Sequence, residues 1–492
     1  MNGARRLLER AGRKLADREA SDFLSPILVK ETRQGVRGNA FTGALLLLQG
    51  LMALSLLGAL LAGTGGSPEV ATALFWSAVA IPSLVVLPLS GLRALSSERE
   101  LRTLEPILLT RLEARAIVSG KWAALAAQIL LLFASVLPFV LLRHFLGGID
   151  VSAELWVMLE LLLCSTLITA LAVCVSASRL SGLFRVLVVF GVGVPLYTMI
   201  QAVIGGHVSL LAAPLLPVAA VAALWLLSVQ LLHSLGAGAL APRGESRSAS
   251  VRVLALAAAP IAIWAASLSE GGHSEVHAPL ALWGVLLLLT ASVAGVVEDR
   301  REHATLDAPL LGGSRLRAAA GSFLAPGWPS GVAFALLVLA AACTSALWLG
   351  AETPDVAIWG LALLAALVQP VTLTQWLAPR TRRRGTLYVI FVIAALGASL
   401  ASSLFDLLAP DELGWVGKLI GALSPLGYAA QHEPLWPLDP SRGEHLAAAV
   451  VVALSVGAAG FHAGRALLER RRLLRAEDRG RPEGALGGAA EA

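Results

Sequence analysis

The chain is too apolar and too poor in charge to fold as a soluble domain. Of its 492 residues, 57% are hydrophobic and 14% are charged, with a net charge of +5, whereas soluble domains carry about 45–50% apolar and about 25% charged residues. The same figures exclude a disordered chain. Since a membrane span needs about 20 apolar residues, we expect an all-α fold, a polytopic membrane helical bundle with short loops.

Twelve apolar windows are long enough to cross a membrane and contain few charged residues. In chain order they lie at 41–63, 70–92, 122–142, 155–176, 186–205, 210–232, 253–269, 280–297, 332–349, 357–378, 387–405 and 446–467. They predict about 12 transmembrane helices in two six-span halves. The predicted parts are an amphipathic segment at 1–40, a first half at 41–235, a linker at 236–252, a second half at 253–468 with a long loop at 406–445, and a tail at 469–492.

The distribution of Lys and Arg favours one orientation of these spans. With a cytoplasmic amino terminus and alternating spans, all but three of the 38 Lys and Arg residues lie on the cytoplasmic side, and the exceptions are Arg143, Lys418 and Arg442. This positive-inside bias predicts that both termini are cytoplasmic and that the loop 406–445 is external. It indicates a bacterial inner membrane and contact with lipids, and it argues against nucleic-acid binding.

Two predicted cytoplasmic loops resemble each other. Residues 99–109 read RELRTLEPILL and residues 301–311 read REHATLDAPLL, at an offset of 202 residues, and each loop follows the second window of its half. An even number of spans per repeat places both copies in the same orientation, so the sequence predicts a parallel repeat of the kind found in transporters.

No catalytic or nucleotide-binding motif is present. The sequence contains no GxxxxGK[ST] loop, no HExxH and no GxSxG, so we expect neither an enzyme nor a bound cofactor or metal ion. Polar residues within the windows are candidates for a substrate pathway, although they could also serve helix–helix hydrogen bonding. These candidates are Glu160, Gln128 and Gln201.

The most specific stretch lies at 96–122. Its leucines recur every three or four residues between charged residues, which is typical of an amphipathic helix at a membrane surface, and Pro106 is expected to divide that helix. The stretch is either an interfacial connection between two spans or a docking helix for a cytoplasmic partner. In the second case the acids Glu98, Glu100 and Glu105 are expected to be exposed to a basic cleft of that partner.

This stretch resembles the cytoplasmic loop of the type-2 ATP-binding-cassette (ABC) transporter permease family, which commonly reads E-R-x-x-G-T-L-E-x-L-L-x-T-P-L-S-x-x-x-I-x-x-G-K. Arg102 and Arg111 replace the usual Gly and Pro. Residues 25–41 are similar to the amino-terminal elbow helix of that family, and residues 423–429 to its segment before the last span. The positions that match the loop are Glu98, Arg99, Thr103, Leu104, Glu105, Leu108, Thr110, Leu112, Ile117, Gly120 and Lys121.

The resemblance implies the permease subunit of an ABC exporter, which binds no nucleotide itself and depends on a separate cytoplasmic ATPase that uses ATP and Mg. It implies that the ATPase docks on Glu98, Arg99, Glu100, Thr103, Leu104, Glu105, Leu108, Gly120 and Lys121. One chain could supply both six-span units, or two copies could form a homodimer. The alternatives are a membrane scaffold that keeps the permease shell without transporting, and an ion-driven secondary transporter.

Overall fold

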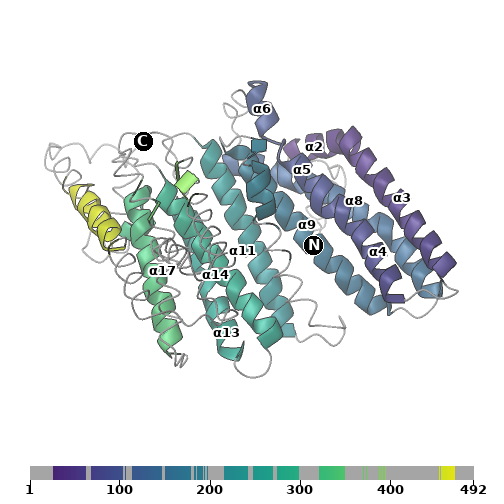
Figure 1. Ribbon diagram of the computed structural model, residues 1–492. Helices are drawn as coiled ribbons and strands as arrows, with labels where there is room; N and C mark the ends of the chain where they lie inside the picture. The colour runs from purple at the N-terminus through teal and green to yellow at the C-terminus, as the bar shows by residue number, and fades with distance from the viewer. Residues whose placement is uncertain are drawn as a thin grey trace, which may run out of the picture. The chain divides into compact units, whose positions relative to one another are not determined.

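The computed structural model consists of helices joined by turns, and the described residues form no strand (Figure 1). The described residues are 26–62, 68–103, 106, 113–146, 150–178, 182–183, 185–191, 193, 197, 215–241, 248–269, 274–298, 321–348, 369–370, 373, 387–388, 390–391, 394, 454, 456–470 and 472.

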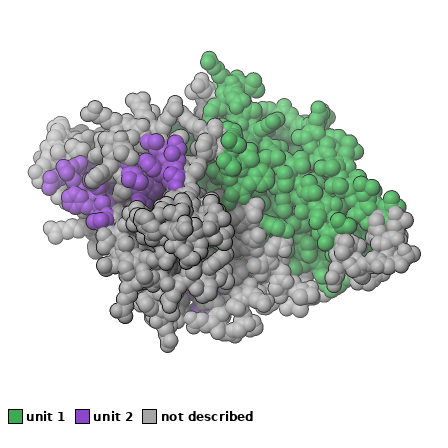
Figure 2. All heavy atoms as spheres, viewed as in Figure 1, with its two compact units in different colours: residues 1–241, 268–283 green, residues 242–267, 284–492 purple. Residues whose placement is uncertain are grey.

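Contacts divide the chain into two compact units, coloured separately in Figure 2. Unit 1 comprises residues 1–241 and 268–283, and unit 2 comprises residues 242–267 and 284–492. The helices labelled before the boundary at 241 are α2 (Pro26–Val36), α3 (Asn39–Ala62), α4 (Pro68–Ile81), η2 (Pro82–Val86), α5 (Leu87–Gly91), α6 (Ser96–Glu100), α8 (Ala114–Leu146), α9 (Val151–Ala177) and α11 (Leu215–Leu240). Those after it are α12 (Ser248–Leu256), α13 (Ala259–Ser269), α14 (Ser274–Val297) and α17 (Trp328–Trp348).

Within the described part of the chain, seven helical stretches are long and apolar enough to cross a membrane. They are Asn39–Leu57, Thr72–Glu100, Ala114–Phe145, Val151–Ala177, Val218–Leu240, Ser248–Ala265 and Leu280–Val297. Each overlaps one of the predicted windows, and α17 overlaps a further window. The expected multi-pass, all-helical membrane fold is therefore confirmed. The windows at 186–205, 357–378 and 387–405 lie largely outside the described residues, and the window at 446–467 is described only at 454 and 456–467, so twelve spans in two halves stays a prediction.

The second span is not the uninterrupted helix that the window 70–92 predicts. A π-helical turn, η2, separates α4 from α5, and Pro88 supplies no N–H five residues after Ser83 to continue the π-helical pattern. The buried carbonyl of Ser83 instead accepts a 2.7 Å hydrogen bond from the hydroxyl of Ser165 on α9. The span also changes neighbours at this turn, since α4 packs mainly on α3 and α5 mainly on α9.

Prolines also set two helix boundaries around the predicted linker at 236–252. Helix α11 continues through a run of Ala, Gly and Leu residues to Leu240. It ends two residues before Pro242, which disfavours a helical conformation of the residue that precedes it. Helix α12 already begins at Ser248, and a turn at 257–258 separates it from α13, where Pro260 is the second residue. Both helices therefore extend into the segment that the sequence predicted as a linker.

Helix α9 lies at the centre of unit 1, where it packs against α8, α11 and α5. Two tryptophans bind its backbone, since Trp122 Nε1 donates to the Thr166 carbonyl at 3.0 Å and Trp225 Nε1 donates to the Leu163 carbonyl at 3.2 Å. A buried indole N–H needs such an acceptor. The surrounding apolar core, contributed by α3, α4, α8 and α9, includes Phe41, Leu48, Met52, Phe75, Ile129, Leu132, Phe133, Val136 and Leu161.

In unit 2, α14 and α17 approach each other through two glycines. A Cβ atom added to Gly331 would overlap the backbone of Gly295, and a Cβ atom added to Gly295 would lie 3.0 Å from the Cα atom of Gly331. Small residues allow such close approach between membrane helices. Trp328, Val332 and Ala335 pack beside this contact.

Candidate functional site

The predicted docking segment begins at a polar cluster that we call the α6 junction, which comprises Glu31, Glu98, Arg99 and Lys121. Lys121 of α8 is its centre, and the side chain is only 6% exposed. Its Nζ atom lies 3.1 Å from Glu31 Oε1 on α2 and 2.7 Å from Glu98 Oε1 on α6. A buried cation stays charged only when it is paired with anions, and here the two carboxylates fulfil this role. Because they come from different helices, the Lys121 ammonium group holds α2, α6 and α8 together.

Arg99 fastens α6 to a fourth helix. Its guanidinium donates to the carbonyl oxygens of Ala177 and Ser178, the latter at 2.7 Å, where α9 ends. The last carbonyls of a helix have no partner within that helix and carry the negative end of its dipole, so an arginine is well suited to this position. Glu98 and Arg99 thus point into the protein, and α6 is attached to α2, α8 and α9.

The chain then turns outward into an exposed tip, which we define as residues 100–103. All four side chains are exposed, and Leu101 is 73% exposed. Figure 1 shows α6 standing out from the end of unit 1 at which α2 also lies. Helix α6 ends at Glu100, and Arg102 follows with a φ angle of 56°. The helix therefore ends before Pro106, because the left-handed residue at 102 reverses the backbone first.

The structure splits the predicted docking residues into two groups. Gly120 and Lys121 are buried in α8, and the side chains of Glu98 and Arg99 are bound within the junction. The expectation that Glu98 is exposed is therefore wrong, because Lys121 binds it. Glu100 and Thr103 lie on the exposed tip, whereas Leu104, Glu105 and Leu108 lie outside the described residues.

The backbone at Arg102 gives a direct test of the tip. A left-handed conformation costs a residue with a Cβ atom about 1–2 kcal/mol, part of which glycine loses again through its unfolded-state entropy. We expect Arg102→Gly to stabilise the tip by about 0.5–1 kcal/mol, seen as about threefold slower amide exchange over residues 96–103. Arg102→Ala is the control, since it removes the same side chain but keeps the Cβ atom. Equal behaviour of the two variants would show that the backbone at 102 is not strained.

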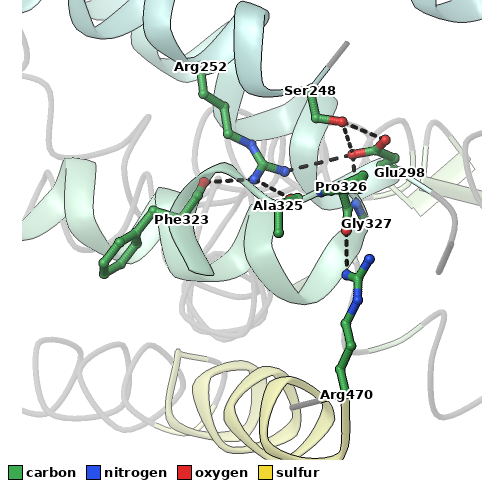
Figure 3. Close-up of polar contacts among 8 residues, drawn as sticks. All are labelled: Ser248, Arg252, Glu298, Phe323, Ala325, Pro326, Gly327 and Arg470. Carbon is green, nitrogen blue, oxygen red and sulfur yellow. Dashed lines mark hydrogen bonds and ion pairs between the residues drawn. The ribbon is translucent and has the colours of Figure 1, made fainter. Parts of the chain in front are cut away.

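A second polar cluster, the α14 junction, lies in unit 2 at the end of α14 (Figure 3). Glu298 accepts hydrogen bonds at 2.6 and 2.7 Å from the hydroxyl of Ser248 on α12, and at 2.9 Å from the backbone N–H of Gly327. Its Oε2 atom also lies 3.8 Å from Arg252 Nη2. The carboxylate thus joins α12 and α14 to the turn that precedes α17.

Two arginines hold the same turn from either side. Arg252 is almost fully buried, and its Nη1 atom donates to the carbonyls of Phe323 and Ala325 at 2.7 and 2.9 Å. Arg470, from the helix that covers 456–470, donates to the carbonyl of Pro326 at 2.6 Å. In Figure 3 the two guanidinium groups approach the turn from different helices.

The two junctions occupy corresponding places in their units. Each joins a short helix (α2, which precedes a candidate span, or α12, which is the first part of one), the end of the next apolar span (α6 or α14) and the start of the apolar helix after that (α8 or α17). The chemistry differs, because the central group is the cation Lys121 in unit 1 and the anion Glu298 in unit 2.

No hydrogen bond joins the predicted pathway residues Glu160 and Gln128 in the described part of the chain. Glu160 of α9 is 2% exposed, and its Oε1 atom has no hydrogen-bond partner among the described residues. Gln128 of α8 donates to the Ala124 carbonyl at 3.3 Å and lies against Gly35 of α2, where a Cβ atom would overlap its amide. Gln128 therefore serves helix packing in this structure. Gln201 lies outside the described residues.

A further buried ion pair lies at the opposite end of unit 1. Arg143 Nη1 binds Glu154 Oε2 at 2.9 Å, Nη2 donates to the Thr72 hydroxyl at 2.7 Å, and the guanidinium carbon lies 4.2 Å from the centre of the Phe75 ring. This contact joins α4, α8 and α9.

Asp150 lies just before α9, and its carboxyl accepts hydrogen bonds from the hydroxyl and the backbone N–H of Ser152. These bonds lower the pKa of the Asp150 carboxyl.

Sequence reasoning missed Glu31, Arg252, Glu298 and Arg470. Arg252, Glu298 and Arg470 are ionisable residues close to an end of an apolar helix, a signal that could have identified them. Glu31 lies in the middle of the polar helix α2 and carries no such signal. The partners of all four residues are distant in sequence, so no local spacing indicates the pairs.

Comparisons with protein-family models, with curated proteins and with solved structures find no match. Within the described residues, no three His, Cys, Asp or Glu side chains form a group that could hold a metal ion.

Proposed function

We propose that this chain is the membrane-spanning permease subunit of an ABC exporter. A separate cytoplasmic ATPase would hydrolyse ATP with Mg, and the permease would convert that cycle into substrate movement across a bacterial inner membrane. In this proposal the chain binds no nucleotide, has twelve spans in two related halves, and keeps both termini in the cytoplasm.

The observation that carries the proposal is the construction of α6. Its base is fastened to α2, α8 and α9 through Glu98 and Arg99, and its tip at residues 100–103 is exposed. A partner that moved the tip would therefore displace three further helices together, which is what a coupling element must do. A purely interfacial connection between two spans would need no such attachment.

Two further features support the proposal. Arg102 occupies the position at which the resembled loop has glycine, and its backbone is left-handed, as a glycine there would permit. The corresponding places of the two junctions support the parallel repeat that the sequence predicts. Glu160 remains the candidate for a residue that lines the substrate pathway, because one of its carboxyl oxygens is buried and has no hydrogen-bond partner among the described residues.

The test is association with a P-loop ATPase encoded beside the gene. We expect the double variant E100K/L101D, which changes only the exposed tip, to lower co-purification of that ATPase at least tenfold, since it reverses a charge and removes an apolar contact at an interface centre. The variant should be inserted and folded as the wild type is, because neither side chain is buried. Glu469→Lys reverses the charge of a half-exposed side chain on the helix at 456–470 and should leave association unchanged.

Wild-type co-purification and ATP-dependent transport by E100K/L101D would contradict docking at the tip. An ATPase that binds but whose hydrolysis moves no substrate would instead favour the scaffold. Substrate movement that follows an ion gradient without ATP would favour the secondary transporter.

A further inference from the structure

A stripe of basic residues runs along helix α2 and onto the residue that follows it, on the face that does not pack against the protein. Lys30, Arg33 and Arg37 are all exposed, and their spacing of three and four residues places them on one side of a helix. Gln34, between them, is exposed as well. We call these four residues the α2 stripe.

The opposite face of α2 is occupied by α8. Glu31, the acidic residue of α2, is turned toward Lys121 at 3.1 Å. Gly35 lies directly against Gln128, with no room for a Cβ atom. These contacts with α8 fix the orientation of α2, so that the stripe faces away from the protein. The carboxylate of Glu31 is bound to Lys121 and does not neutralise the stripe.

The stripe lies where the chain enters its first span. Only Arg37 and Gly38 separate α2 from α3, and the backbone N–H of Gly38 donates to the Gly35 carbonyl at 3.0 Å. Helix α3 is a candidate membrane span from its first residue, Asn39. Because α2 is joined so closely to a span, its exposed basic face is within reach of the lipid headgroups.

The positive charge of the α2 stripe indicates that its ligand is an anion. Among the described residues, none of the three cations of the stripe has an ion-pair partner. A Lys or Arg near an anionic membrane surface contributes about 1 kcal/mol each to binding, and the effect is screened by salt.

We infer that the α2 stripe binds the headgroups of anionic phospholipids in the leaflet that faces α2. Because Glu31 on the other side of the same helix binds Lys121, these lipids hold in place one of the helices of the α6 junction. The inference does not depend on the proposed ATPase partner, and its test needs none.

The experiment uses the full chain in nanodiscs of phosphatidylcholine, with or without about 30% phosphatidylglycerol, and measures amide hydrogen exchange in α2. We expect phosphatidylglycerol to slow exchange in α2 about tenfold, and about 0.5 M salt to remove most of that effect. The variant R33Q/R37Q should lose most of the lipid response while exchange in α9 stays as in the wild type, which shows that the bundle is folded. The matched variant R465Q/R472Q removes two other exposed arginines and should respond as the wild type does.

Equal exchange of α2 in the two membranes would overturn the inference, and so would a full lipid response in R33Q/R37Q. Loss of the response in R465Q/R472Q would overturn it by showing a dependence on overall charge. Inorganic phosphate added to phosphatidylcholine discs should not slow exchange in α2, and slowing by phosphate would indicate a site for free anions in place of lipid.

Discussion

Lys121→Met should destabilise unit 1 by about 3–5 kcal/mol, because it leaves two carboxylates partly buried without their shared cation. A loss of this size lowers the midpoint of thermal denaturation by roughly 3–5 °C in a chain of 492 residues. The measurement is the denaturation midpoint of the detergent-extracted protein. Met matches the length and volume of the Lys side chain, so the effect comes from charge and not from a cavity.

Two variants show that pairing is the cause. Glu31→Gln with Glu98→Gln in the Lys121→Met background removes the unpaired charges, and we expect it to recover about half of the lost stability, since buried ion pairs can be replaced by neutral groups at small cost. Lys121→Arg keeps the charge and should lose less than Lys121→Met. A Lys121→Met midpoint equal to that of the wild type would show that the junction does not stabilise the fold.

Gly331→Ala should destabilise unit 2 by about 3 kcal/mol, because the added methyl group overlaps the backbone of Gly295 and forces α14 and α17 apart. Gly464→Ala is the matched control, since a Cβ atom at that position has nothing within 4 Å. The control should be neutral or stabilise the helix by about 0.5–1 kcal/mol, the usual gain of Ala over Gly in a helix. The denaturation midpoints of the two variants should therefore move in opposite directions, and similar midpoints would contradict the close approach of the two helices.

The membrane class could be predicted from the sequence because the length and polarity of a span are local properties. The interruption of the second span by a π-helical turn could not be predicted from the sequence. Pro82 and Pro88 are visible in the sequence, but prolines are tolerated in membrane helices when neighbouring groups satisfy the freed backbone. The group that does so here is the hydroxyl of Ser165, which lies on another helix, 82 residues away along the chain.

For the candidate site, too, the sequence indicates some of the residues but not the contacts between them. The motif singled out Glu98 and Lys121 but not the contact between them, and it assigned Glu98 to an exposed surface. Lys121 is 90 residues from its other partner, Glu31, and only the packing of α2 on α8 brings these side chains together. Arg102 is the opposite case, because the sequence already marked it as a departure from glycine, and the unusual backbone lies at that residue.

The ion pair between Arg143 and Glu154 bears on how the chain enters the membrane. Only 11 residues separate the two side chains, across the short connection from α8 to α9. An arginine that crosses a bilayer alone costs at least about 2.5–3.5 kcal/mol at its centre, and closing so short a loop costs little entropy. An α8–α9 hairpin can therefore neutralise its own charge before any other helix arrives, which makes these two helices a natural unit of insertion during biosynthesis.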